Sequence, residues 1–402
     1  MTKPLAGVRV LDLSRVLAGP WATQLLADLG ADVIKVEKPG AGDDTRHWGP
    51  PWLEHGEQKV AAYYLAANRG KRSVAIDFST GEGAALVRRM AADADVVVEN
   101  FKVGGLRKFG LDAESLRTAH PRLIYASITG FGQDGPYASR AGYDYIIQGM
   151  GGLMSLTGLP DDLPGGGPMR VGVAVADLFT GMYTANAILA ALLHREQTGE
   201  GATIDMALFD TQLAMLANQA SNALVSGHDP QRQGAGHPNI VPYQPFEASD
   251  EPIIIAVGND RQFAKLAAIV GHPEWVEDPA FATNAARVAA RSRLVPMIAD
   301  VIATKPASAW LEQLEAAGIP AGPINTISQA LADPQAVHRG VRITAGGGML
   351  GEVPMVGCPI RLNGERSDAP LPPPGLGEHG DLLGEWADED ELQRLRAAGI
   401  VG

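Results

Sequence analysis

The first third of the chain alternates short apolar runs with segments of helix length, and this alternation restricts the fold more than any other feature. Strands that are apolar on both sides are typical of a parallel sheet buried between two layers of helices. The pattern therefore predicts an α/β fold with a Rossmann-like, doubly wound domain, to which residues 202–210 add a further strand. The predicted strands are "VRVLDLS" (8–14), "ADVIKVE" (31–37), "SVAIDF" (73–78), "DVVVEN" (95–100) and "LIYASITGFG" (123–132).

The rest of the chain predicts a second, smaller α+β domain, because 402 residues exceed the size of one ordinary core. After a turn-rich segment at 227–246, the run "IIIAVG" (253–258) starts a new pattern of strand and helices. The Pro/Gly-rich stretch 367–379 predicts an extended linker, and 388–400 predicts a last helix. We expect a large domain of residues 1–204 completed by 375–402, linkers at 205–229 and 326–374, and a small domain at 230–325.

Charge and composition narrow the classes of function. The net charge of −13 disfavours a nucleic-acid-binding protein. Residues 1–110 hold 15 Lys+Arg against 13 Asp+Glu, a charge of +2, so the remainder carries −15 and an anionic ligand would be drawn to the N-terminal part. A single cysteine, Cys358, allows no internal disulfide, and no uninterrupted apolar run approaches the roughly 20 residues of a membrane span. We expect a cytoplasmic protein that binds neither nucleic acid nor membrane.

Known cofactor motifs do not occur where the fold would put them. The turn after the first strand reads "SRVLAGP" and lacks the glycines of a dinucleotide fingerprint. The histidines are dispersed without zinc-site spacing, and there is no P-loop. We expect no metal and no tightly bound cofactor. Basic residues do gather at predicted strand ends, where phosphates would bind a doubly wound sheet: Lys35 and Lys38; Arg69, Lys71 and Arg72; Lys102, Arg107 and Lys108.

Asp177 is the one carboxylate in the apolar stretch "VGVAVADLFTGMYTANAILAALLH" (171–194). One interpretation is a helix N-cap, since Asp is among the best capping residues and a cap contributes about 1 kcal/mol. The other is a reacting group, and the two roles can coexist.

Several stretches together resemble the class III CoA-transferases, the family of formyl-CoA transferase and carnitine CoA-transferase, over essentially the whole chain. They include "VRVLDLSRVLAGPWATQLLADLGADVIKVEKPGAGDDTR", "NRGKRSVAIDF", "VVVENFKVGGLRKFGL", "SITGFGQDGPYASRAGYDYIIQGMGG", "VGVAVADLFTGMY", "GEGATIDMALFD" and "LGEH". The resemblance implies a nonclassical Rossmann domain with a smaller domain, and a homodimer of two interlocked rings. It also implies an enzyme that moves CoA from an acyl-CoA to a small carboxylic acid, with CoA as substrate.

The resemblance implies a role for particular residues. Asp177 matches the family's nucleophile, which forms an aspartyl anhydride and then an aspartyl-CoA thioester. Asp144 matches a glutamate near that nucleophile, although a polar turn residue is the plainer interpretation. Lys108 and Lys38 match basic residues that contact CoA phosphates and the adenine end. The expected CoA contacts are Val16, Leu17, Lys38, Asn100, Phe101, Lys108 and Tyr143.

The chain differs from formyl-CoA transferase at two places that bear on the choice of substrate. Leu17 replaces an active-site glutamine of formyl-CoA transferase, and "GAGHPNIVPYQPF" (234–246) stands where that enzyme has a four-glycine lid. The chain is therefore similar to relatives that use succinyl-CoA and larger dicarboxylic acids. Two alternatives remain open: a non-catalytic acyl-CoA-binding protein, and an α-methylacyl-CoA racemase, whose histidine would occupy the position of Tyr143.

Overall fold

The computed structural model describes residues 3–367 and 371–402, so residues 368–370 of the predicted linker lie outside the described residues. The chain divides into two compact units. The large unit consists of residues 1–151, 172–217 and 334–402, and the small unit of residues 152–171 and 218–333. The domain boundaries expected from the sequence stay a prediction.

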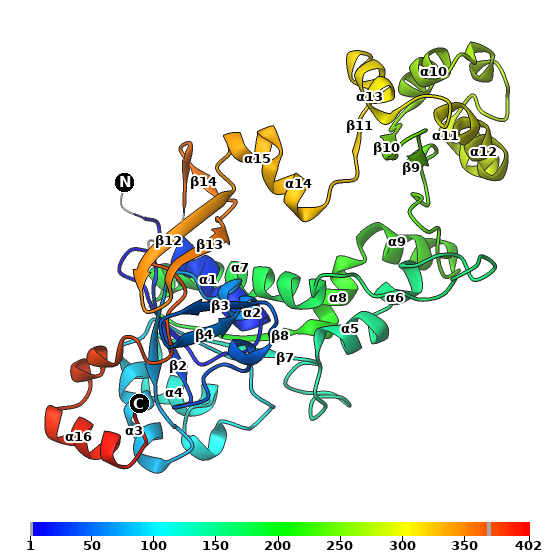
Figure 1. The fold of residues 1–402 in the computed structure, drawn as a ribbon. Helices are drawn as coiled ribbons and strands as arrows, with labels where there is room; N and C mark the ends of the chain where they lie inside the picture. The colour runs from blue at the N-terminus through cyan, green and yellow to red at the C-terminus, as the bar shows by residue number, and fades with distance from the viewer. Residues whose placement is uncertain (1–2, 368–370) are drawn as a thin grey trace. The chain divides into compact units, whose positions relative to one another are not determined.

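A six-stranded parallel sheet forms the centre of the large unit (Figure 1), as the alternation predicts. Its order is β5-β2-β1-β6-β7-β8, so successive strands run outward in one direction from β1 and then in the other from β6. The strands are β1 (Arg9–Asp12), β2 (Asp32–Glu37), β5 (Lys71–Ala75), β6 (Val96–Glu99), β7 (Ile124–Thr129) and β8 (Thr203–Ala207). This is the order of a doubly wound sheet, which confirms the predicted fold class.

Helices cover both faces of this sheet, because alternate residues of each strand face opposite sides. On one side the strands pack against α3 (Gly81–Ala92), α4 (Ala113–Ala119) and the C-terminal helix α16 (Glu389–Ala397). On the other side they pack against α1 (Ala18–Asp28), α7 (Val175–Thr198), α5 (Asp144–Met150) and α8 (Leu208–Met215).

Helix α7 carries the apolar stretch that contains Asp177. Of the described residues, only this helix is long and apolar enough to cross a membrane, judged by length and composition alone. It packs against α1, β7, β8 and α8, which are the surroundings of a core helix. Gly181 allows α7 to lie close to α1, because a Cβ added there would stand 2.6 Å from the backbone oxygen of Ala18.

Smaller elements complete the large unit. Two hairpins, β3 (Trp52–His55) with β4 (Gln58–Ala61) and β12 (Arg342–Gly348) with β13 (Gly351–Val356), enclose a separate apolar cluster around the buried Tyr64. The remaining elements of this unit are α2 (Ala62–Leu65), α15 (Pro334–His338), the pair β14 (Arg361–Leu362) and β15 (Glu365–Arg366), and the 3-10 helices at Asp44–His47, Arg107–Phe109 and Gly380–Glu385.

The small unit is an α+β structure, as predicted. An antiparallel sheet of β9 (Tyr243–Glu247), β10 (Pro252–Ala256) and β11 (Ala321–Pro323) carries its core. The helices packed on that core are α10 (Asp260–Ile269), α11 (Asn284–Ala289), α12 (Arg291–Ile302) and α13 (Ala307–Ala316). This unit also contains α6 (Leu153–Leu156), α14 (Ile327–Ala332) and the helix at Pro273–Val276. After α8 the chain turns at Ala217, whose φ of 46° starts α9 (Ala217–Ser226) as a separate helix.

Candidate active site

A cavity of about 410 Å³ opens where the strand order reverses, between the carboxyl ends of β1 and β6. In a doubly wound sheet, the chains leaving such a switch point diverge and leave room for a ligand. Arg15, Val16 and Leu17 follow β1 along one part of the wall, and Asn100 and Phe101 follow β6 along another. Asp177, from the first turn of α7, lines the same cavity, which we call the Asp177 cavity.

The loop after β1 is held in an unusual conformation. Val16 has a φ of 70°, in the left-handed region that a β-branched residue rarely adopts. Its backbone N–H donates to the carboxylate of Asp43 at 3.2 Å. Asn100 fixes the preceding residue twice, accepting from the N–H of Arg15 at 2.8 Å and donating to its carbonyl oxygen at 2.6 Å. Such strain persists only where the surroundings determine the conformation, so this part of the cavity wall is preorganised.

Below the loop lies a buried ionic network. The Lys35 ammonium pairs with Asp43 at 2.9 Å and donates to the carbonyl oxygen of Ser14 at 2.7 Å. Burial alone would lower the pKa of Lys35, but the nearby carboxylates, Asp43 foremost, outweigh it and raise the pKa. Lys71 pairs with Asp12 at 3.0 Å, and there burial prevails and lowers the pKa of Lys71 to about 8. Lys35 and Asp43 therefore hold the loop after β1 in place, because Lys35 binds the Ser14 carbonyl and Asp43 accepts from the N–H of Val16.

The interpretation of the basic clusters as phosphate ligands is therefore wrong for four residues, because carboxylates of the protein itself pair with them. The four are Lys35, Arg69, Lys71 and Arg72, with the partners Asp43, Asp28, Asp12 and Asp32. Arg107 also has an acidic partner, Glu114. Lys38, Lys102 and Lys108 are exposed.

Asp177 does not cap its helix. Helix α7 begins at Val175 after Ala174, so Asp177 is the third helical residue, and no side chain of the capping residue bonds the first turn. Within the described part of the chain, no hydrogen bond or ion pair reaches the Asp177 carboxylate. Burial, followed by the charge of Asp144, raises the pKa of Asp177 to about 7. The capping hypothesis is wrong, and an unpartnered carboxylate faces the cavity.

The capping bond comes instead from Asp144, the first residue of α5. One oxygen of its buried carboxylate accepts from the N–H of Ala176 at 2.8 Å, and the other accepts from the Gln148 side chain at 2.7 Å. Asp144 therefore fixes the first turn of α7, one residue before Asp177. It acts on Asp177 through the backbone and through its charge.

The N-terminus of α1 adds a second electrostatic feature. The first N–H groups of a helix have no partner within the helix, and no side chain caps them here. Leu17 and Ala18, at this terminus, line the Asp177 cavity. The helix end therefore contributes partial positive charge to the wall of the Asp177 cavity.

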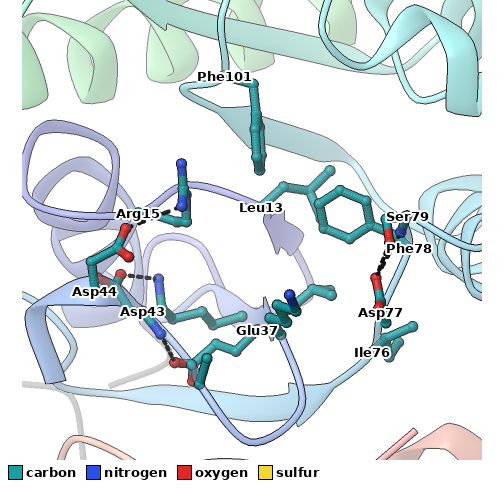
Figure 2. A pocket seen from close by; sticks show the side chains of 15 residues that line it. Leu13, Arg15, Glu37, Asp43, Asp44, Ile76, Asp77, Phe78, Ser79 and Phe101 are labelled. Atoms are coloured by element: carbon teal, nitrogen blue, oxygen red, sulfur yellow. Dashed lines mark hydrogen bonds and ion pairs between the residues drawn. The ribbon is translucent and has the colours of Figure 1, made fainter. Parts of the chain in front are cut away.

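A second cavity of about 400 Å³ adjoins the first and shares Arg15, Asp44 and Phe101 with it. Figure 2 shows the rings of Phe101 and Phe78 directed into it. The two rings meet edge to face at 5.7 Å. Lys38 contributes an exposed cation to the wall. We call this the Lys38 cavity. Arg15 and Lys35 also line it but pair with Asp44 and Asp43, whereas Lys38 is exposed and its charge acts on the nearby Asp77. An exposed cation beside aromatic rings suits an anionic ligand with a flat ring.

The structure brings most of the sequence-predicted residues together. Val16, Leu17, Asn100, Phe101 and Tyr143 line the Asp177 cavity. Lys38 lines the adjoining one, together with Phe101. Lys108 is not among the residues that line either cavity; its ammonium lies 4.6 Å from the ring of Phe109. Contact between these sequence-predicted residues and CoA stays a prediction.

Sequence reasoning missed Tyr63. Its hydroxyl group is close enough to the site that, after burial, the charges of Asp177 and Asp144 raise the pKa of Tyr63. Its ring packs edge to face against Trp48 at 5.2 Å between centroids. In the sequence it is one of two tyrosines in "AYYL", a pattern typical of a buried helix, so nothing in the sequence indicated that Tyr63 lies near the site. The residues that the structure describes include no group of three or more His, Cys, Asp or Glu that could hold a metal ion.

Comparison with known proteins places these features in a family. A model described as CoA-transferase family III matches residues 5–380. A succinate–glutarate CoA-transferase of Agrobacterium fabrum is 53% identical over 378 residues, which cover 94% of this chain and 94% of that protein. A human succinyl-CoA:glutarate CoA-transferase is 41% identical over 402 residues, covering 99% and 90%. The crystal structure of a CAIB/BAIF family protein from Brucella suis has a TM-score of 0.85 and 51% identity, covering 96% and 99%.

Proposed function

Because this chain belongs to CoA-transferase family III, we propose that it moves CoA from succinyl-CoA to a small dicarboxylic acid through covalent intermediates on Asp177. The resemblance found in the sequence motifs is thereby confirmed, and the chain is a CoA-transferase. The observation that carries the proposal for Asp177 is its carboxylate, which lacks a partner and lines a cavity at the switch point of the sheet. The relatives' names, succinate–glutarate and succinyl-CoA:glutarate CoA-transferase, support the substrate class.

The proposed reaction runs through two anhydrides. The Asp177 carboxylate attacks the thioester carbonyl and displaces CoA thiolate, which leaves a mixed anhydride. The thiolate then attacks the aspartyl carbonyl, releasing succinate and forming an aspartyl-CoA thioester. The acceptor carboxylate attacks this thioester and again displaces the thiolate. Attack of the thiolate on the acceptor's acyl carbonyl yields the new acyl-CoA and restores Asp177.

The neighbouring groups suit this chemistry. The N-terminus of α1, at Leu17 and Ala18, would stabilise the oxyanion that forms at each attack. Asp144 would hold the first turn of α7 and keep the Asp177 pKa high, which increases the nucleophilicity of the carboxylate once it is ionised. Burial of Asp177 limits the water that could hydrolyse an anhydride.

The two adjoining cavities suggest how CoA lies. We place the thioester in the Asp177 cavity and the nucleotide end in the Lys38 cavity, beside Phe78 and Phe101. Asn100 and Val16 would contact the connecting arm, with Lys108 an outlying phosphate contact. Lys38 and Lys108 offer point charges to phosphate, without the bidentate geometry of arginine.

We also propose a cytoplasmic homodimer. The outer faces of α5 and α7 expose more large apolar side chains than a lone subunit usually leaves in water. They are Tyr145, Ile146, Met150, Phe179, Met182, Tyr183 and Leu193. A second copy of the chain, interlocked with the first as the family resemblance implies, is the proposed cover.

The function is tested by incubating the protein with succinyl-CoA and a panel of carboxylic acids, and identifying the products by mass spectrometry. We expect new acyl-CoA with dicarboxylic acids of about five carbons and release of one succinate for each. Binding of succinyl-CoA without transfer to any acid would instead indicate a non-catalytic binding protein.

A further inference from the structure

Three cations line the Asp177 cavity, and they differ in their partners. Arg15 is paired with Asp44 at 3.0 Å, so its charge is already balanced. Arg140 has no carboxylate within 4.0 Å in the described parts of the chain; its recorded hydrogen bond goes to the sulfur of Met150 at 3.9 Å. Lys102, the third cation, is exposed and follows Phe101 in the chain. The cavity therefore contains positive charge that the protein itself does not neutralise.

Arg140 is held in place by aromatic rings. Its guanidinium carbon lies 4.5 Å from the ring centroid of Tyr137 and 5.4 Å from that of Phe131. The two rings pack edge to face at 5.5 Å, and Phe131 also packs on Phe209, so Phe131 anchors the exposed Tyr137 and Arg140 side chains. Stacking leaves the N–H groups at the guanidinium edge available, and that edge matches a carboxylate in a two-point contact.

The segment that carries Arg140 is tied to the nucleophile. The lining residues of the Asp177 cavity in this segment are Ala138, Arg140, Ala141, Gly142 and Tyr143, and the next residue in the chain is Asp144. Asp144 bonds the N–H of Ala176 in the first turn of α7. Arg140 is therefore linked to the first turn of α7 by the four residues that follow it in the chain and by the Asp144 hydrogen bond.

A dicarboxylic acid brings two charges into this cavity. One carboxylate must reach the aspartyl thioester, and the other is then removed from bulk water. That removal costs free energy unless a cation pairs with the carboxylate. We propose that Arg140 binds the distal carboxylate of the acid and so makes the enzyme select dicarboxylic over monocarboxylic substrates. This inference rests on the proposed function and names the residue that determines its specificity.

The test compares two acceptors that differ only in the distal group. Glutarate carries a carboxylate where pentanoate carries a methyl group. In a reaction with a covalent enzyme intermediate, kcat/KM for the acceptor reports only the second half-reaction, so effects on succinyl-CoA cancel. The variants are Arg140→Gln, which removes the charge, Arg140→Lys, which retains it without the fork, and Lys102→Gln as the matched control.

We expect Arg140→Gln to lower kcat/KM for glutarate on the order of 100-fold, as for loss of a charge-assisted contact, while kcat/KM for pentanoate changes less than about threefold. Arg140→Lys should recover part of the loss, and Lys102→Gln should leave the glutarate-to-pentanoate ratio as it is in the wild type.

Three results would overturn the assignment. Equal losses for both acids would make Arg140 a general support of the cavity. A weaker inhibition by free CoA, with an unchanged ratio, would make it a CoA contact. A collapse of the ratio in Lys102→Gln alone would assign the carboxylate to the other cation. Failure of the proposed function looks different, because then no acid is converted by any form of the protein.

Discussion

At the scale of the single residue, the site depends on a carboxylate that the protein leaves without a hydrogen bond. Exposed carboxylates titrate near pH 4, and most buried ones are paired. Asp177 is only partly exposed and has no ion-pair partner among the described residues, and burial together with Asp144 raises its pKa to about 7. The adjacent Asp144 has the opposite arrangement, since both of its oxygens accept hydrogen bonds. The different environments of the two carboxylates support the different roles proposed for them.

This difference predicts the pH dependence of the first half-reaction. The proposed nucleophile is the ionised form of Asp177, so kcat/KM for succinyl-CoA should rise with pH through about 7 and then level off. Asp144→Asn removes the neighbouring charge while its amide oxygen can still accept from the N–H of Ala176, so the rise should move to lower pH. Initial rates between pH 5 and 9 measure both profiles. A rise that stays in place in Asp144→Asn would show that Asp144 does not set the ionisation of Asp177.

At the scale of the element, the strands were predictable because burial on both faces leaves a local signature. Each predicted run overlaps an observed strand, although β5 begins at Lys71, two residues before the run predicted at 73–78, and the motif around Asp177 falls on the predicted helix. The ionic network was not predictable in this way. Lys71 pairs with Asp12 across 59 positions, and Arg69 pairs with Asp28 across 41, so only the folded sheet reveals that these cations are internal. The capping bond of α7 is likewise non-local, since it comes from Asp144 on α5, and nothing in the sequence around Asp177 reveals it.

The contact between α7 and α1 predicts a sensitive glycine. In Gly181→Ala the new methyl group would stand 2.6 Å from the Ala18 oxygen and 3.1 Å from the Trp21 side chain, so the helices must move apart. Asp177 lies one turn away on α7, and displacing it from α1 by about 1 Å should lower kcat on the order of 100-fold while the protein remains folded.

The matched control is Gly81→Ala in α3, where nothing lies within 4 Å of the added Cβ. It should leave kcat unchanged and the thermal midpoint equal or slightly higher. Equal kcat in both variants would mean that the spacing of the two helices does not position the nucleophile.

At the scale of the whole molecule, the apolar faces of α5 and α7 predict self-association. Sedimentation velocity from 0.1 to 10 µM, concentrations on the order of those at which stable dimers persist, should show only dimer. Met182→Glu on the outer face of α7 should weaken association, whereas a charge on α3, such as Arg88→Glu, should not. A folded wild-type monomer across this range would contradict the proposed assembly.

The central claim is that Asp177 becomes covalently attached to CoA. Wild-type protein is mixed with succinyl-CoA, treated with borohydride, digested, and analysed by peptide mass spectrometry, with Asp177→Asn as the control. Borohydride reduces an aspartyl thioester to an alcohol, so the account predicts homoserine at position 177 in the wild type and no change in the variant, which should also lose turnover by several orders of magnitude. An unmodified Asp177 peptide in an enzyme that turns over, or substantial turnover by a folded Asp177→Asn free of deamidation, would contradict the account.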